Sequence, residues 1–202
     1  MKIAGFEPLS LSDFPGHCAA VVFTRGCNWR CPFCHNGSLW ASAGEGPGEQ
    51  RVLTLLRQRA RLLDVVVSGG EPTLQPDLPD FLVELKALGL KVKLDTNGSF
   101  PNVLKQVLSK GLVDFVAMDI KAPWDRYAEL AGVDADVTAL QASIKHIIDW
   151  GGTHQFRTTH VPNLLTNADI SHIHDALPAN VTHHVQPFIP ELAADARLRQ
   201  AG

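Results

Sequence analysis

Three of the four cysteines lie within eight residues of one another, at Cys27, Cys31 and Cys34. Cysteines that form a disulfide framework are spread along a chain, because they stabilise it by closing long loops. Clustered thiols in a reducing compartment usually hold a metal instead. We therefore expect a metal centre in this segment, which we call the cysteine loop and place at residues 24–40.

Two kinds of metal centre are compatible with this spacing. Structural zinc takes four ligands, normally from two Cys-x2-Cys-like pairs, and the adjacent donor His35 follows Cys34 too closely to join it on one small ion. The Cys-x3-Cys-x2-Cys spacing suits a [4Fe-4S] cluster, which four cysteines normally hold. Three cysteines would leave one iron open for a ligand that is not protein. The spacing favours the cluster, and zinc remains the alternative.

The composition is that of a globular domain. The 202 residues are 45% hydrophobic and 19% charged, which excludes a disordered chain and a coiled coil. Eighteen basic and 21 acidic residues give a net charge of -3, which argues against a dedicated nucleic-acid or acidic-membrane binder. No apolar stretch approaches the roughly 20 residues that span a bilayer. The N-terminus has no signal-peptide core, so we expect a cytoplasmic protein.

Short apolar runs alternate with longer stretches whose apolar residues recur at helical spacing. We expect strands at Cys18–Phe23, Val65–Val67, Val92–Asp95, Phe115–Asp119, Gln155–Thr159 and Val181–Phe188, with Cys18 as a buried strand thiol. We expect helices at Arg51–Leu63, Leu78–Leu88, Asn102–Ser109, Val137–Trp150 and Asn167–Leu177. This alternation predicts an α/β fold with a parallel sheet and right-handed crossovers.

The number of strand–helix units limits the architecture. Six units are too few for a closed eight-fold barrel of roughly 250 residues. We predict a partial, open (β/α)6 barrel, with a doubly wound open sheet as the alternative. One domain is expected over residues 1–202, with a flexible connector at Ala41–Gly48 and a short charged tail at residues 190–202.

Polar residues follow or end five consecutive expected strands. The cysteine loop follows the first, and the later strands lead into Ser68-Gly69-Gly70-Glu71-Pro72, Asp95-Thr96-Asn97-Gly98, Met118-Asp119-Ile120-Lys121 and the region of Arg157. The C-terminal strand ends form the active-site face of strand–helix barrels and the ligand crevice of open α/β sheets. We therefore expect these residues to gather at one rim.

The chemistry of these residues describes a ligand. Two adjacent glycines let the backbone approach a ligand closely, and Glu71 beside them suits an ammonium group. Asp95 and Asp119 suit ribose hydroxyls or a small cation, whereas Lys121 and Arg157 suit a carboxylate. S-adenosylmethionine (SAM) carries an amine, a carboxylate and a sugar, and its amino and carboxylate groups can chelate an open iron.

These motifs resemble those of a known family. The segment from Cys27 to Asn36 resembles the radical SAM signature, Cys-x3-Cys-x-aromatic-Cys, in its glycyl-radical-activase form. Residues 68–72 resemble the Gly-Gly-Glu motif of that superfamily, and residues 95–98 and 118–121 are similar to motifs of the pyruvate formate-lyase activating enzymes. Residues 11–16 and 156–159 resemble the activating proteins of anaerobic ribonucleoside-triphosphate reductase. The resemblance covers roughly residues 1–190.

The resemblance implies a radical SAM fold and a site for each group. It gives Cys27, Cys31 and Cys34 as ligands of the [4Fe-4S] cluster. It gives the SAM-binding residues as Phe33, His35, Ser68, Gly69, Gly70, Glu71, Asp95, Asn97, Asp119, Lys121 and Arg157. It also implies a monovalent cation held by Asp95 and Asp119 near the SAM carboxylate. One departure stands at the sixth strand, where Gln186-Pro187-Phe188-Ile189 replaces a SAM-contacting histidine of the pyruvate formate-lyase activases.

The resemblance implies an oxidoreductase that activates another enzyme. A low-potential donor such as flavodoxin would reduce the cluster, and SAM would be cleaved to methionine and a 5′-deoxyadenosyl radical. That radical would take a hydrogen atom from a glycine of a partner glycyl-radical enzyme, here anaerobic ribonucleoside-triphosphate reductase. Two alternatives remain: a radical SAM enzyme acting on another glycyl-radical enzyme, a peptide or a small molecule, and a non-catalytic iron–sulfur or zinc protein.

Overall fold

One seven-stranded sheet organises the molecule in the computed structural model, which describes residues 1–41 and 43–200. The strands follow one another across the sheet in chain order: β1 (Ile3–Ser10), β2 (Ala19–Thr24), β3 (Asp64–Gly69), β4 (Val92–Thr96), β5 (Phe115–Asp119), β6 (Thr153–His160) and β7 (His183–Pro187). Strand β1 runs antiparallel to β2, and the other neighbours are parallel.

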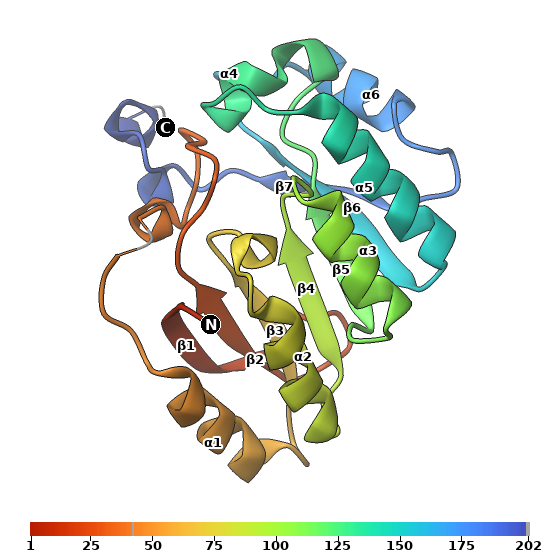
Figure 1. Ribbon diagram of the computed structural model, residues 1–202. Helices are drawn as coiled ribbons and strands as arrows, with labels where there is room; N and C mark the ends of the chain where they lie inside the picture. Colours follow the sequence, from red (N-terminus) through yellow and green to blue (C-terminus); the bar gives the residue numbers. More distant parts are fainter. Residues whose placement is uncertain (42, 201–202) are drawn as a thin grey trace.

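The connections between parallel strands are mostly helical. They contain α1 (Glu49–Arg59), α2 (Leu78–Ala87), α3 (Pro101–Ser109), α4 (Tyr127–Ala131), α5 (Val137–Trp150) and α6 (Asn167–Asp175). Figure 1 shows the sheet curving with its helices on the outside. A doubly wound sheet would reverse its strand order at a switch point, and this strand order never reverses. The predicted open α/β barrel of six strand–helix units is confirmed. Strands β1 and β7 are its two edges, and each is paired on one side only.

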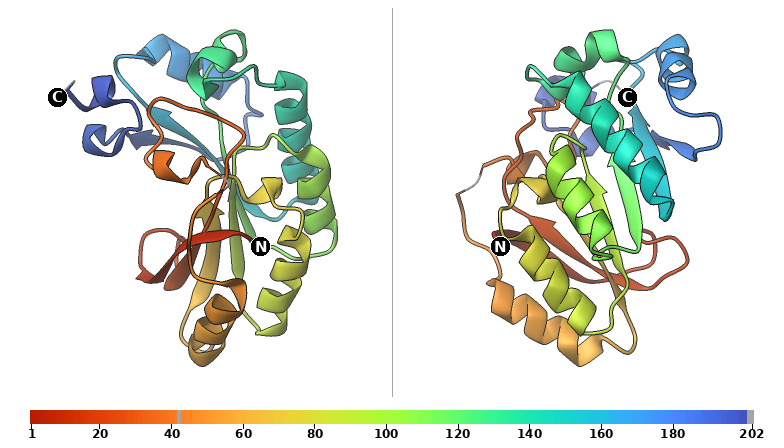
Figure 2. Two further views of the ribbon diagram at one scale, coloured as in Figure 1. Left: turned by 60° about the vertical axis from the view of Figure 1, so that its left-hand side comes forward. Right: turned by 45° about the vertical axis from the view of Figure 1, so that its right-hand side comes forward.

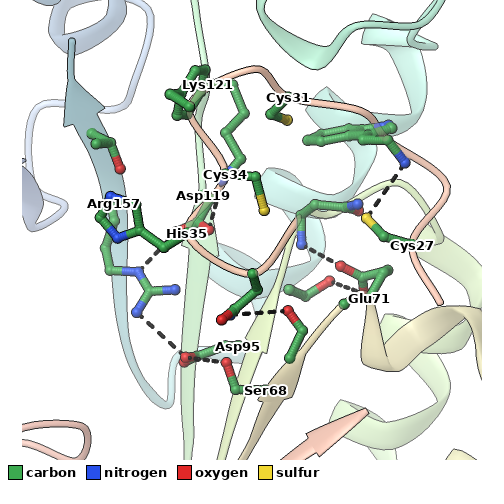
Figure 3. A pocket seen from close by; sticks show the side chains of 18 of the residues that line it. Cys27, Cys31, Cys34, His35, Ser68, Glu71, Asp95, Asp119, Lys121 and Arg157 are labelled. Atoms are coloured by element: carbon green, nitrogen blue, oxygen red, sulfur yellow. Dashed lines mark hydrogen bonds and ion pairs between the residues drawn. The ribbon is translucent and has the colours of Figure 1, made fainter. Parts of the chain in front are cut away.

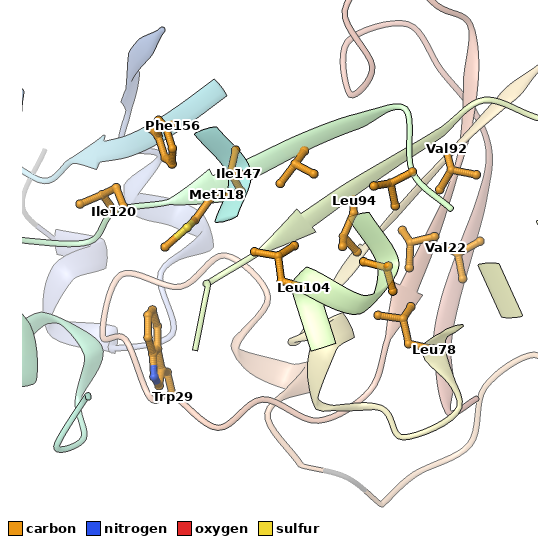
Figure 4. Packing of buried hydrophobic residues seen from close by; sticks show 14 of the residues in the cluster. Val22, Trp29, Leu78, Val92, Leu94, Leu104, Met118, Ile120, Ile147 and Phe156 are labelled. Atoms are coloured by element: carbon orange, nitrogen blue, oxygen red, sulfur yellow. The ribbon is translucent and has the colours of Figure 1, made fainter. Parts of the chain in front are cut away.

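The main hydrophobic core lies between the outer face of the sheet and the helices. Val22 of β2, Leu94 of β4 and Met118 of β5 project from the same face of the sheet and are fully buried there. Figure 4 shows these side chains packed with Leu78 and Leu104 of the covering helices. Burial of such apolar side chains is the dominant force that holds the helices on the sheet.

A smaller apolar cluster fills the inner face of the sheet at the end opposite the site. Phe14 lies there against Phe115, with ring centroids 5.8 Å apart, and both side chains are buried. Val21 of β2 and Val66 of β3 complete this layer. The segment between β1 and β2 therefore plugs the bottom of the half-barrel.

The first part of the chain differs from the expectation in two ways. Strand β1 was not predicted, because its sequence contains Gly5 and Pro8 and lacks a regular apolar alternation. Proline is tolerated at a sheet edge, where no hydrogen-bonding partner is lost. Cys18 is not a buried strand thiol: it precedes β2 by one residue and is exposed.

The remaining segments differ from expectation mainly at their ends. Strand β5 and helix α5 have the predicted bounds, whereas the short helix α4 was not predicted. The tail from Pro190 onward forms short helical turns, and the Asp195 amide donates to the Pro32 carbonyl oxygen at 2.9 Å. Figure 2 shows this tail beside the cysteine loop. Ser42 of the connector and residues 201–202 of the tail lie outside the described residues.

Among the described helices, none is both long and apolar enough to cross a bilayer.

Candidate functional site

A pocket of about 300 Å³ opens at the C-terminal ends of the parallel strands. All of the residues predicted for the site line it: Cys27, Cys31, Phe33, Cys34, His35, Ser68, Gly69, Gly70, Glu71, Asp95, Asn97, Asp119, Lys121 and Arg157. Residues from the cysteine loop and from four strand ends thus meet in one cavity of a size that small-molecule ligands occupy. Figure 3 shows this arrangement.

Strand register explains why the polar residues converge. Ser68, Asp95 and Asp119 lie on the inner face of β3, β4 and β5, and Arg157 is paired with Asp119 across β5 and β6. Side chains on adjacent strands that share a face lie close together. The Ser68 hydroxyl accordingly donates to Asp95 Oδ2 at 3.0 Å.

Backbone hydrogen bonds close the neck of the cysteine loop and anchor its middle. The Gly26 amide donates to the Leu39 carbonyl oxygen at 2.8 Å, and the Arg30 amide donates to that of Ala131 at the same distance. Trp29 is buried against Tyr127 of α4, with ring centroids 5.6 Å apart. The unpredicted helix α4 therefore supports the cysteine loop.

The three thiols line the pocket without forming a site for one ion. No trio of His, Cys, Asp or Glu side chains among the described residues is close enough together to hold a single metal ion. Burial raises the pKa of Cys27 to about 11 and that of Cys31 to about 12. The backbone amide of Trp29 donates to Cys27 Sγ at 3.4 Å, which fixes the direction of that side chain. Metal binding at these thiols requires loss of their protons.

The Gly69-Gly70 turn touches the start of the cysteine loop. Gly69 has a backbone φ of +111°, a value that residues other than glycine rarely adopt. Its carbonyl oxygen accepts a hydrogen bond from Asn36 Nδ2 at 3.3 Å. A Cβ on Gly70 would lie 2.1 Å from the carbonyl oxygen of Gly26. Glycine at position 70 is therefore what allows the turn and the loop to pack together.

Gly70→Ala should displace the neck of the cysteine loop, because the clash is with backbone and no side chain can move aside. We expect a loss of about 2 kcal/mol in the free energy of unfolding and a lower iron content after anaerobic reconstitution. Urea unfolding and iron analysis measure both. The matched control is Gly48→Ala, where an added Cβ meets nothing within 4 Å. Equal stability and iron content in the two variants would contradict this account of the turn.

Glu71 is only 1% exposed, and protein donors surround its carboxylate. It accepts hydrogen bonds from the Thr73 amide at 2.9 Å, the Thr96 hydroxyl at 2.7 Å and the Asn97 amide at 2.7 Å. Burial raises the pKa of Glu71, although these donors favour its ionised form. Glu71 thus joins the turn after β3 to the turn after β4, which a reading of the sequence did not predict.

Asp95 and Asp119 form ion pairs with the basic residues of the pocket. Arg157 Nε donates to Asp119 Oδ1 at 2.8 Å, and Lys121 Nζ donates to Asp119 Oδ2 at 2.9 Å. Burial alone would raise the pKa of Asp119, but Arg157 and Lys121 outweigh it and hold the pKa at about 2. Burial opposes the charge of Lys121, but the Asp119 carboxylate prevails and raises the Lys121 pKa.

The pocket also contains residues that the sequence analysis did not select. These are Asp13, Trp29, Asn36, Trp40, Thr96, Thr159 and Gln186. Thr159 follows Arg157 by two positions on β6 and so shares its face, a signal that was available from the strand pattern. Asp13 lies after the unpredicted strand β1, so its approach to the pocket could not be predicted.

At the exit of β7, Gln186 lines the pocket where the pyruvate formate-lyase activases are expected to have a histidine. The next aromatic residue, Phe188, stacks on the ring of His35, with centroids 6.0 Å apart and planes inclined by 27°. This contact connects the last strand to the cysteine loop. The tail that follows packs against the same loop through the hydrogen bond from the Asp195 amide to the Pro32 carbonyl oxygen.

Comparison with known proteins identifies a family. The model of the radical SAM superfamily matches residues 21–177. A protein of Methanocaldococcus jannaschii that is assigned as a glycyl-radical enzyme activating enzyme is 32% identical over 98% of this chain and 84% of its own length. The pyruvate formate-lyase-activating enzyme of Clostridium pasteurianum is 36% identical over 59% of this chain and 52% of its own length.

Solved structures show the same fold at low sequence identity. Streptococcus suis SuiB bound to its precursor peptide SuiA superposes with a TM-score of 0.68 at 18% identity, covering 90% of this chain. The enzyme anSMEcpe with bound AdoMet superposes with a TM-score of 0.60 at 14% identity, covering 81% of this chain. The chain spans 44% and 49% of these two proteins.

Proposed function

Because the chain belongs to the radical SAM superfamily, we propose that its pocket holds a [4Fe-4S] cluster and SAM and generates a glycyl radical on a partner enzyme. When bound, the cluster supplies the electron that splits SAM into methionine and a 5′-deoxyadenosyl radical able to remove a hydrogen atom from glycine. The protein's part is to bind and orient these groups and to exclude water. The observation that carries the proposal is the meeting of all the predicted site residues in one pocket.

Cys27, Cys31 and Cys34 would hold the cluster through three of its irons. The fit rests on the donor set: the thiols surround one pocket, yet no described trio of ligands is close enough for one ion. This geometry favours a group with several separated metal atoms over tetrahedral zinc. The fourth iron would have no protein ligand and would be left for SAM.

The strand-end residues would hold SAM beside the cluster. The backbone of Gly69 and Gly70 offers carbonyl oxygens to its amine end, and Glu71 keeps this turn in place by accepting hydrogen bonds from Thr73, Thr96 and Asn97. Lys121 and Arg157 offer positive charge to its carboxylate. We expect the remaining contacts from the rest of the candidate set: Phe33, His35, Ser68, Asp95, Asn97 and Asp119.

A protein loop suits this pocket as the substrate. The unpaired edges of the sheet both reach the pocket, through Asp13 after β1 and Gln186 in β7. Because the sheet does not close into a barrel, a segment of a partner could enter the pocket and supply the missing wall.

The partner that we propose is anaerobic ribonucleoside-triphosphate reductase, with a low-potential protein such as flavodoxin as electron donor. Residues 11–16 and 156–159 support this choice through their resemblance to the activating proteins of that reductase. The cytoplasm is the compartment that we propose, since thiols stay reduced there.

The second candidate is activation of pyruvate formate-lyase. The specific observation in its favour is the 36% identity to the activating enzyme of Clostridium pasteurianum over 127 residues. That match covers a smaller part of the chain than the Methanocaldococcus jannaschii protein does.

Anaerobic reconstitution tests the cofactor assignment. We expect about four irons and four sulfides per chain, as in a [4Fe-4S] cluster. After reduction with dithionite, the protein should slowly convert SAM to 5′-deoxyadenosine and methionine, which liquid chromatography detects. One tightly bound zinc in anaerobically purified protein, without SAM cleavage by the reconstituted form, would overturn the proposal.

A further inference from the structure

A lysine lies where few lysines are found, inside the half-barrel. Lys93 of β4 is 1% exposed, and its inward direction follows from its position two residues before Asp95 on the same strand face. Its ammonium group lies 5.9 Å from the centre of the Phe115 ring and donates a hydrogen bond to Asp95 Oδ1. A buried charge is tolerated only when it is paired, so the pairing with Asp95 is what maintains Lys93 at this position.

Every carboxylate oxygen of Asp95 and Asp119 has a cationic partner. Lys93 Nζ is paired with Oδ1 of Asp95, and Arg157 Nη1 lies 3.5 Å from Oδ2 of Asp95. Arg157 Nε is paired with Oδ1 of Asp119 at 2.8 Å, and Lys121 Nζ is paired with Oδ2 of Asp119 at 2.9 Å. We call these five residues the charge cluster. Glu71 is bonded to a separate group of donors.

The charge cluster does not fit a monovalent metal cation. Its two carboxylates face three basic groups, so it carries one net positive charge. A sodium or potassium ion needs oxygen ligands, and each oxygen here already accepts from a basic residue. Such an ion would also be repelled by the neighbouring ammonium and guanidinium groups. The expected cation between Asp95 and Asp119 therefore disagrees with the residues present.

We infer that Lys93 takes the place of a bound monovalent cation, so that binding of SAM by this protein is independent of sodium and potassium. The inference rests on the proposed function, because it concerns the same SAM site. Lys93 is a positioning residue: its ammonium fixes Asp95 and offsets its charge, so that Lys121 and Arg157 together with Asp119 keep one net positive charge for an anionic group of the ligand.

Equilibrium dialysis of labelled SAM against the oxidised, cluster-loaded protein tests this inference. In the wild-type protein, the dissociation constant should agree within about twofold between potassium chloride and choline chloride at equal ionic strength. Sodium-23 NMR gives a second readout that needs no SAM. A bound sodium ion would broaden the sodium resonance, and added potassium would displace it and narrow the line again. The wild-type protein should show no such potassium-sensitive broadening.

Lys93→Met should introduce a cation requirement. Removal of the ammonium leaves one oxygen of Asp95 free, and a small cation can then occupy the space. SAM binding by this variant should be about tenfold weaker in choline than in potassium, a typical coupling between two linked ligands. Potassium-sensitive sodium broadening should appear. The matched control is Lys145→Met on α5, where the lysine is 72% exposed and paired with Asp149, and it should behave as wild type.

Wild-type binding that weakens severalfold in choline would overturn the inference, as would potassium-sensitive sodium broadening. These two comparisons need no variant, so they decide the matter even if Lys93→Met fails to fold. Absence of SAM binding in both salts would contradict the proposed function instead, and the sodium spectra would still report on Lys93.

Discussion

Replacing Cys31 with alanine should abolish the iron–sulfur centre and with it all cleavage of SAM. Cys31 is buried, and the cysteine loop has no other thiol besides Cys27 and Cys34. With two thiolates left, the cluster loses a third of its protein anchors. We expect iron after anaerobic reconstitution to fall from about four atoms per chain to less than about one. Iron and sulfide analysis, together with the visible absorption of the cluster, measures the loss.

The chain offers a matched control in its fourth cysteine. Cys18 is exposed and lies outside the pocket lining. Cys18→Ala should therefore keep the iron content and change the free energy of unfolding by less than about 0.5 kcal/mol. Loss of iron in Cys18→Ala that equals the loss in Cys31→Ala would show that the ligands are wrongly assigned.

Much of the fold could be predicted because helix and strand periods differ clearly in this sequence. Strand β5 and helix α5 have the predicted bounds, since Phe115–Asp119 is a short apolar run and Val137–Trp150 repeats at helical spacing. Strand β1 could not be predicted in this way. Its pairing with β2 depends on a distant segment of the chain and on two register shifts.

The position of the site could be predicted because it depends on topology alone. Parallel strands bring their C-terminal ends to one rim, so Asp95, Asp119 and Arg157 had to meet once the strands were assigned. The partners within the rim depend on side-chain geometry. From the sequence, a carboxylate after two glycines suits an ammonium ligand. In the fold, the Glu71 carboxylate instead accepts hydrogen bonds from Thr73, Thr96 and Asn97.

Lys93 illustrates what a strand pattern leaves out. In the run Val92-Lys93-Leu94, alternation alone predicts a lysine that faces solvent. The inner face of this half-barrel is closed at its bottom by Phe14 and Phe115, so the lysine is buried beneath Asp95. The burial of Lys93 depends on residues that cover the inner face of the sheet, and the pattern of a single strand does not reveal them.

Formation of a glycyl radical on another protein is the second large effect that we expect. Asp13 and Gln186 come from the two edges of the sheet, and both line the pocket at the strand ends. A reacting glycine must reach SAM through it, and oxygen must be absent. The substrate protein for the test is the partner that we propose, an anaerobic ribonucleoside-triphosphate reductase with a C-terminal glycyl loop, taken from the same genome as this chain.

Electron paramagnetic resonance tests the central claim most directly. The reduced, cluster-loaded protein is mixed with SAM and the reductase, and the spectrum is recorded after freezing. We predict a doublet signal from a glycyl radical on the reductase. It should be absent with Cys31→Ala and absent when the radical-forming glycine of the reductase is replaced by alanine. Rapid SAM turnover on a small metabolite, with no radical on any protein, would contradict the account.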